Sequence, residues 1–328
     1  MGFDTLLLSD LHLNDSLETE YRWGIFDFIR HLRMNEETPN AFKNIFILGD
    51  LTDQKDRHSG KLVNRIVDHL VELSNYHRIY ILRGNHDGLD PEWPYFRFLN
   101  HFENISFIKD IARITIDGSV PLHFYAHGYS SQFIPNPHGI SFFHETFRGV
   151  VYKTGQIADG EHLTDSKFGT LCFSGDIHEP QQVGDVVYVG SQYHTRFGDE
   201  FNPRAILLDI ASRKYESIPV NIGKKITLTV NSPEEFIEKI AQHPSDMVRI
   251  QIPDSKEATK LFQYISASKK EYPSIQQVHI VKEGAEQLPS LVATPRNDSE
   301  LIHEYGKIKN LPAERIEIGV KIHANNPN

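Results

Sequence analysis

Residues 6–12 read Leu6-Leu7-Leu8-Ser9-Asp10-Leu11-His12, an apolar run of strand length that ends in a carboxylate and an imidazole. The same arrangement recurs along the first two-thirds of the chain, where short runs rich in Ile, Leu, Val, Phe and Tyr alternate with polar stretches. Such runs are typical of buried strands. The expected strands are Thr5–Ser9, Asn44–Leu48, Arg78–Leu82, Leu122–Ala126, Ile140–Phe143, Thr170–Ser174, Val186–Val189 and Ala205–Leu208.

Helical patterns lie between the early strands. Residues Tyr21–Met34 and Gly60–Asn75 carry apolar side chains at spacings of three and four, which predicts one buried face on each helix. Strand and helix in alternation predict an α/β sheet covered by helices. The later strands have less helix between them, so a second sheet or an antiparallel edge to the first is expected there.

The character of the chain changes near residues 211–222, where Ala211-Ser212-Arg213-Lys214 resembles a turn. A small β-α-β-α-β module is expected next, built from Lys225–Val230, Pro233–Gln242, Met247–Ile252, Lys256–Ser268 and Ile275–Val281. The predicted organisation is a first domain over 1–215, an α/β capping domain over 222–290 and a tail over 291–328. A short helix, Ser299–Lys307, and an amphipathic piece, Pro312–Ile322, are expected in the tail.

Composition narrows the classes of protein. The chain has 328 residues and one cysteine, Cys172, so a disulfide framework and a zinc–thiolate site are excluded. The net charge of −10 argues mildly against nonspecific binding to nucleic acid, although acidic metal ligands would inflate it. No apolar run is long enough to span a membrane, and no basic segment precedes the first apolar stretch, so a cytoplasmic protein without membrane contact is expected.

Side chains with metal-ligand chemistry follow five of the expected strands. Strand ends in such sheets converge on one crevice, and carboxylates and imidazoles without thiolates suit manganese, iron or zinc. One carboxylate can bridge two cations about 3.5–4 Å apart, the clamp used in phosphoryl transfer. Each of these strand-end motifs alone is weak evidence for metal binding. Their occurrence in order after five of the expected strands is what predicts a metal site. The candidate ligands are Asp10, His12, Asp50, Asn85, His144, Asp176 and His178.

Four motifs resemble those of the calcineurin-like metallophosphoesterases: Asp10-Leu11-His12, Gly49-Asp50, Gly84-Asn85-His86-Asp87 and Gly175-Asp176-Ile177-His178. The resemblance covers roughly residues 1–215. It implies a β-sandwich flanked by helices, in α/β/β/α layers. It also implies one cation on Asp10, His12, Asp50 and His178, and a second on Asp50, Asn85, His144 and the residue at 176. His86 would then act as proton donor or transition-state stabiliser beside a metal-activated water that attacks in line.

Three positions leave alternatives open. Asp176 stands where the family usually has histidine, so the second site is either more anionic or weaker. His127 competes with His144 as a ligand, and His144 is preferred because its surroundings and its order in the chain fit the family. Arg83 is a candidate for binding a phosphate oxygen, with a surface salt bridge as the equal alternative.

Past the last motif, the chain resembles SbcD-type nuclease subunits and their phage counterparts, which carry a small capping domain in the same place. This resemblance implies a manganese-dependent DNA exonuclease or endonuclease, with iron, magnesium or zinc as other metals. It implies an SMC-like ATPase partner of the SbcC type, docked on the tail, and a homodimer. The alternatives are a phosphatase or small-nucleotide phosphodiesterase with the same metals, and a non-catalytic scaffold with a degenerate site.

Overall fold

The computed structural model describes residues 2–34, 42–116, 120–160 and 163–282, all within one compact unit. The predicted tail over 291–328, its two expected helical pieces and the end of the predicted capping domain lie outside the described residues. Within the described ranges, no helix has the length and apolar character that a membrane span requires.

The first sheet has six strands in the order β12-β11-β1-β2-β3-β4. Strands β1 to β4 are parallel, and β11 and β12 are added antiparallel at one edge. Helices α1 (Gly24–Met34) and α2 (Gly60–Ser74) cover one face, with 3-10 turns η1 (Leu17–Trp23) and η2 (Tyr95–His101) nearby. The strands are β1 (Thr5–Leu8), β2 (Asn44–Leu48), β3 (Arg78–Leu82), β4 (Ile105–Ile108), β11 (Arg204–Asp209) and β12 (Lys214–Pro219).

The second sheet also has six strands, in the order β5-β6-β7-β8-β10-β9. Strands β6, β7, β8 and β10 are parallel, and the two edge strands are antiparallel to their neighbours. A short 3-10 turn, η3 (Ser130–Gln132), follows β6. The strands are β5 (Ile111–Ile116), β6 (Val120–Tyr125), β7 (Ile140–His144), β8 (Leu171–Gly175), β9 (Gln181–Val183) and β10 (Val186–Tyr188).

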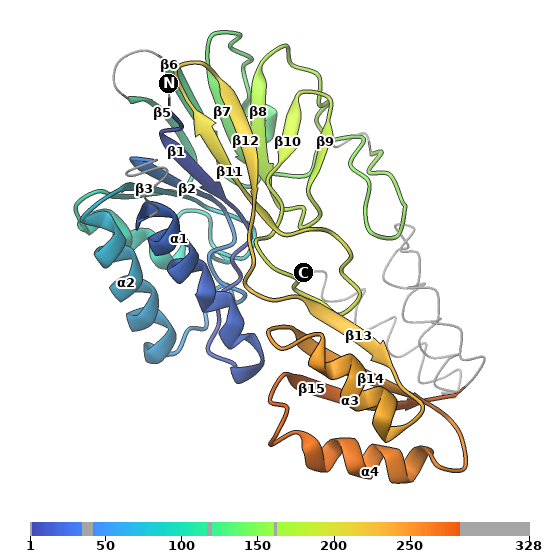
Figure 1. The fold of residues 1–328 in the computed structure, drawn as a ribbon. Coiled ribbons are helices and arrows are strands. Elements are labelled where there is room, and N and C mark those ends of the chain that lie inside the picture. Colours follow the sequence, from blue (N-terminus) through green and yellow to red (C-terminus); the bar gives the residue numbers. More distant parts are fainter. Residues whose placement is uncertain (1, 35–41, 117–119, 161–162, 283–328) are drawn as a thin grey trace, which may run out of the picture. The chain divides into compact units, whose positions relative to one another are not determined.

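Both faces of the central strands are buried, which is why they read as continuous apolar runs. Because side chains alternate across a strand, Leu7 and Phe46 pack between the two sheets, whereas Leu6 and Leu8 pack toward α1 and α2. Figure 1 shows the two helices on the outer side of the β1–β3 layer, with the β5–β10 layer on the other side. This arrangement confirms the predicted α/β class, with two large sheets flanked by helices.

All eight predicted strands are present, but four further strands escaped prediction. β4, β5 and β9 lie at sheet edges. The side chains of β12, a fourth edge strand, are mostly exposed, so no apolar pattern marks it. β12 pairs with β11 and carries the first sheet to Pro219, past residue 215, where the first domain was expected to end. The predicted helix at Tyr21–Met34 is divided into η1 and α1.

A third, smaller sheet follows in the order β13-β14-β15, with all strands parallel. Two helices connect these strands, and the unit has its own apolar core around Phe236, Val248 and Ile265. The elements are β13 (Lys225–Thr229), α3 (Pro233–Ala241), β14 (Met247–Pro253), α4 (Ala258–Ser268) and β15 (Ile275–Val281). This β-α-β-α-β order and these boundaries agree with the predicted module to within two residues.

Candidate metal centre

The carboxyl ends of five strands bring the candidate ligands together. Three of these strands, β1 to β3, belong to the first sheet, and two, β7 and β8, belong to the second, so ligands far apart in the sequence become neighbours. Asp10 and His12 follow β1, Asp50 follows β2, Asn85 and His86 follow β3, His144 is the last residue of β7, and Asp176 and His178 follow β8.

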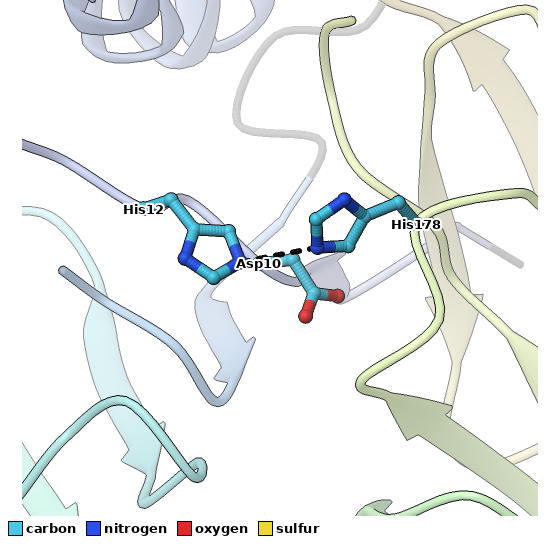
Figure 2. A group of neighbouring side chains, drawn as sticks. All are labelled: Asp10, His12 and His178. Carbon is cyan, nitrogen blue, oxygen red and sulfur yellow. Dashed lines mark hydrogen bonds between the residues drawn. The ribbon is translucent and has the colours of Figure 1, made fainter. Parts of the chain in front are cut away.

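One group consists of Asp10, His12 and His178 (Figure 2), whose potential ligand atoms lie within 4.8 Å of one another. The Nε2 atoms of the two imidazoles are 3.1 Å apart. The Nδ1 atoms point to oxygens instead: His12 Nδ1 is 3.2 Å from Asp53 Oδ1, and His178 Nδ1 is 3.1 Å from Thr195 Oγ1. With a proton on each Nδ1, both Nε2 lone pairs face one point, and a cation there would be bound by both.

A second group surrounds His144, which is fully buried. Its Nδ1 is 2.7 Å from the carbonyl oxygen of Leu48 and keeps its proton there, so Nε2 is the nitrogen that a cation would bind in place of a proton. That Nε2 lies 3.4 Å from Asp50 Oδ1, 3.0 Å from Asn85 Oδ1 and 3.8 Å from Asp176 Oδ1. A ring nitrogen beside two carboxylates and a side-chain amide is a donor set that suits a divalent cation.

Asp50 lies between the two groups. Its Oδ2 is 3.5 Å from His12 Nε2, and its Oδ1 is 3.4 Å from His144 Nε2. One carboxylate therefore faces two imidazoles that belong to different groups, which is the placement a carboxylate needs to bridge two cations. The residues present fit a pair of divalent metal ions.

His127 and His144 were both candidates for one ligand position. The His127 side chain is 38% exposed, and its Nδ1 lies 3.8 Å from Glu145 Oε1 rather than among the strand-end carboxylates. Its ring centroid is 6.2 Å from that of His144. The geometry therefore favours His144, the preferred candidate.

Arg83 does not lie where its expected role requires. Its Nε donates to the carbonyl oxygen of Lys109 at 2.8 Å, and its Nη2 donates to that of His127 at 2.6 Å. The residue is 4% exposed, and burial lowers its pKa. A buried guanidinium that is held by backbone carbonyls joins β3 to the ends of β4 and β6. This placement argues against the expected contact with a phosphate oxygen and also against the surface salt bridge.

Four candidate ligands have backbones in the left-handed region. The φ angles are 55° at Asp10, 41° at His12, 53° at Asp50 and 78° at Asp176. Residues other than glycine adopt this region rarely, at a cost of order 1–3 kcal/mol each, and such residues cluster at functional sites. The surrounding packing therefore holds these side chains in positions that the local chain would not choose.

Asp87 fixes the loop that carries Asp50. The buried Asp87 carboxylate accepts hydrogen bonds from the backbone N–H groups of Gly84 at 2.7 Å, Asp50 at 2.9 Å and Leu51 at 2.9 Å. Burial, and then the charge of Asp50, raise the pKa of Asp87 to about 6. Asp87 therefore orients the backbone beside the shared carboxylate. Asp53 contacts His12, with Oδ1 3.2 Å from Nδ1.

The carboxylates also set the protonation of the group. Burial works against a charged His144, yet the charges of Asp50, Asp10 and Asp176 raise its pKa well above the usual value. Burial, together with the neighbouring His12, lowers the pKa of His178. Concentrated negative charge of this kind favours binding of cations.

Several residues of the site were not predicted. Arg22 donates from Nη1 to Asp53 Oδ2 at 2.8 Å and to the carbonyl oxygen of His12. Thr146 Oγ1 donates to Asp176 Oδ2. Arg196 lines a cavity of about 270 Å³ together with five candidate ligands: His12, Asp50, Asn85, Asp176 and His178. Each contact joins positions distant in the sequence, and no local pattern marks any of them.

Together, the fold and the strand-end clusters define an α/β sandwich protein with a candidate dinuclear metal centre. The model of the calcineurin-like phosphoesterase family matches residues 3–180, more than half of the chain, and the protein belongs to that family. One similar solved structure is a novel archaeal phosphodiesterase, with 16% identity and a TM-score of 0.34 over 66% of this chain and 98% of that chain. No curated protein matched this chain.

Proposed function

We propose that this protein is a two-metal phosphodiesterase that cleaves DNA. The observation that carries the proposal is the placement of Asp50, whose two carboxylate oxygens face His12 and His144 at 3.5 and 3.4 Å. When bound, two divalent cations supply Lewis acidity and a more acidic water molecule. Asp10, His12, Asp50 and His178 would hold one cation, and Asp50, Asn85, His144 and Asp176 the other.

His86 is the proposed acid. Its Nδ1 lies 2.8 Å from the carbonyl oxygen of Asp53, so Nδ1 keeps its proton. Its backbone N–H donates to Asp50 Oδ1 at 2.8 Å, which ties the residue to the shared carboxylate. The protonated ring then has a second N–H, at Nε2, available to a leaving oxygen in the cavity that His86 lines.

The nuclease assignment rests on the region after the family match. The β-α-β-α-β unit over 225–281 has the size and position of the capping domain of SbcD-type nucleases. We infer a manganese-dependent exonuclease or endonuclease subunit that works with an SMC-like ATPase of the SbcC type, in a complex that contains a homodimer of this chain. Arg196 lines the cavity, and its positive charge supports an anionic substrate.

The test is a substrate panel. Purified protein with manganese is incubated with linear double-stranded DNA, single-stranded DNA, an aryl phosphodiester and an aryl phosphomonoester. We expect both DNAs and the aryl diester to be cleaved, and His86→Ala to lower kcat on each by about 10²–10⁴-fold. His138→Ala is the matched control, because His138 is exposed in the loop before β7, at the opposite end of that strand from His144.

The outcomes separate the candidate functions. Cleavage of the monoester alone would overturn the proposal in favour of a phosphatase. Cleavage of the aryl diester but of neither DNA would favour a small-nucleotide phosphodiesterase. Bound metal without activity toward any substrate, even with an SMC-like ATPase added, would favour a scaffold.

A further inference from the structure

A second cavity, of about 290 Å³, adjoins the metal centre and shares Asp176 and His178 with it. Two segments outside the strand-end motifs supply its other walls. One is the hairpin around Tyr152, and the other is the loop over 195–201. The family match ends at residue 180, so one of these walls lies beyond it. Of the side chains on these two segments, the function proposed above uses only Arg196.

The hairpin that carries Tyr152 is held firmly. Its strands are bridged at Val151 and Ile157, and Tyr152 N–H donates to the carbonyl oxygen of Gln156 at 2.9 Å. The side-chain amide of Gln181 accepts from Val151 N–H at 2.9 Å and donates to the Val151 carbonyl oxygen at 3.0 Å. These bonds join the hairpin to β9, the edge of the second sheet, and Tyr152 stays 40% exposed on the cavity wall.

The opposite loop is organised by Asp199. Its Oδ2 accepts the N–H groups of Thr195 at 2.9 Å and Arg196 at 2.8 Å, and its Oδ1 is 3.0 Å from Lys153 Nζ. Thr195 Oγ1 in turn contacts His178 Nδ1 at 3.1 Å. Arg196 directly follows Thr195, the residue that contacts the candidate metal ligand His178, and Asp199 fixes the backbone of both. Its side chain lines both the cavity of the metal centre and the adjoining one.

The walls suit one nucleoside better than a second phosphate. Tyr152 and Phe201 offer aromatic faces, and base stacking on such faces is worth about 1–3 kcal/mol per base. Lys153 and Glu179 offer a donor and an acceptor for the polar edge of a base or the sugar. The positive charge of Lys153 is already matched by Asp199, so Arg196 is the cation best placed for a phosphate.

We propose that this cavity, called here the nucleoside subsite, binds an unpaired nucleoside joined to the scissile phosphate, with Tyr152 stacked on the base and Arg196 bound to the phosphate. The proposal rests on the phosphodiesterase function inferred above and names the substrate class for it. A volume of about 290 Å³ is at the lower end of the range for ligand pockets, so one nucleotide unit fits and a base pair does not. A paired base would first have to leave its stack.

The first experiment compares two substrates of the manganese-loaded protein. One is a short single-stranded oligonucleotide, and the other is bis(4-nitrophenyl) phosphate, which has no nucleoside. We expect Tyr152→Ala to lower the ratio of kcat/KM on the oligonucleotide to kcat/KM on the aryl diester by about 5–150-fold, mainly through KM. Arg196→Ala should lower kcat/KM on both substrates, because each carries the phosphate that Arg196 contacts.

Tyr76→Ala is the matched control. Tyr76 is another exposed tyrosine, 58% accessible, and it lies after α2 at the amino end of β3, away from the strand ends that carry the ligands. It should leave the ratio unchanged. A ratio that stays within about twofold in Tyr152→Ala, with the melting temperature and bound manganese preserved, would overturn the nucleoside subsite.

A second experiment separates the failure of the subsite from the failure of the DNA function. Deoxyadenosine monophosphate and deoxyribose 5-phosphate are compared as inhibitors of aryl diester hydrolysis. We expect the nucleotide to inhibit at least about fivefold more tightly in the wild-type protein, and this preference to disappear in Tyr152→Ala. Equal inhibition in the wild type would overturn the subsite. If the preference is seen but DNA is not cleaved, the subsite stands and the DNA function fails.

Discussion

At the scale of single residues, Gly49 and Gly84 lie so close to candidate metal ligands that no side chain fits at either position. A Cβ atom at Gly84 would lie against the Asp50 carboxylate and 2.5 Å from the Asp50 backbone nitrogen. A Cβ atom at Gly49, where φ is 90°, would fall within the His144 imidazole. Neither neighbour is the free end of a flexible side chain, so a larger residue at either position must displace a candidate ligand.

Gly84→Ala tests this directly. We expect a loss of at least about 100-fold in kcat/KM on an aryl phosphodiester, because a displacement of about 1 Å at a catalytic group costs this much. Gly60→Ala is the control: Gly60 begins α2, and a Cβ atom there meets nothing within 4 Å. It should keep full activity and match or slightly raise the free energy of unfolding, since alanine favours helix. Wild-type activity in Gly84→Ala would contradict the geometry.

Asp176 stands where the family usually has histidine. The position of its carboxylate indicates whether this residue can bind the second cation. Its Oδ1 lies 3.8 Å from His144 Nε2, and its backbone N–H donates to Asp10 Oδ1 at 3.1 Å. Thr146 Oγ1 holds the other carboxylate oxygen. A carboxylate held in this way is available as a ligand of the second cation.

We therefore expect Asp176→Ala to lower the manganese bound per chain from two ions to one, and Asp176→His to retain two. Metal analysis after equilibrium dialysis measures both variants against the wild type. A matched substitution at Asp185 should leave the content unchanged, because the carboxylate of Asp185 accepts from the N–H groups of Phe168 and Gly169, away from the ligands. Two ions in Asp176→Ala would remove Asp176 from the ligand set.

At the scale of secondary-structure elements, the connection between α2 and β3 contains a buried titratable residue, His77. His77 is 4% exposed, its ring stacks on Phe42 with centroids 4.7 Å apart, and its Nδ1 is 3.2 Å from the Phe42 carbonyl oxygen. Burial lowers the pKa of His77 below its usual value of 6.5, against the opposing effect of that hydrogen bond. The unfolded chain therefore binds more protons than the folded chain once the pH falls below 6.5.

The free energy of unfolding should consequently fall as the pH decreases below about 6.5. The contribution that neutral His77 makes to stability should be complete above that pH. His77→Phe keeps the stacking and removes the titration, so its free energy of unfolding should fall less than that of the wild type between about pH 7 and 5. Denaturant unfolding of both proteins, each saturated with manganese, gives the difference and cancels the titration of the metal centre. Equal slopes for the two proteins would contradict the assignment.

The strands illustrate why some elements can be predicted and others cannot. β1, β2 and β7 are buried on both faces, and local composition alone marks such strands. β12 has mostly exposed side chains and is ordered by its pairing with β11, which no short window of sequence contains. Edge strands are defined by their neighbours, so they are the ones that prediction missed.

At the scale of the whole molecule, the candidate metal centre is built from titratable side chains of both large sheets. Asp10 and Asp50 come from the first sheet, and His144, Asp176 and His178 come from the second. Buried carboxylates of like charge repel one another, and bound cations would remove that repulsion. Metal binding should therefore stabilise the sandwich as a unit.

Removal of metal by a chelator should lower the melting temperature by several degrees. The expected stabilisation is about 2.7 kcal/mol when free metal is 100 times Kd. Scanning calorimetry with and without manganese measures this shift. His178→Ala should show a smaller shift than the wild type, and His138→Ala the same shift. A melting temperature that does not respond to manganese in the wild-type protein would contradict a centre shared by the sheets.

What the sequence alone determined is the set of central strands, the module over 225–281 and the order of the candidate ligands. These features depend on local composition, because a buried strand and the residue after it are contiguous in the chain. Only the tertiary structure shows that His144 lies among the carboxylates while His127 does not, and that Arg83 is bound to backbone carbonyls. It also places Thr195 against His178, and Arg196 in the same cavity wall. Those outcomes depend on which carbonyl or carboxylate each side chain meets across the two sheets, and its partner is distant in the sequence.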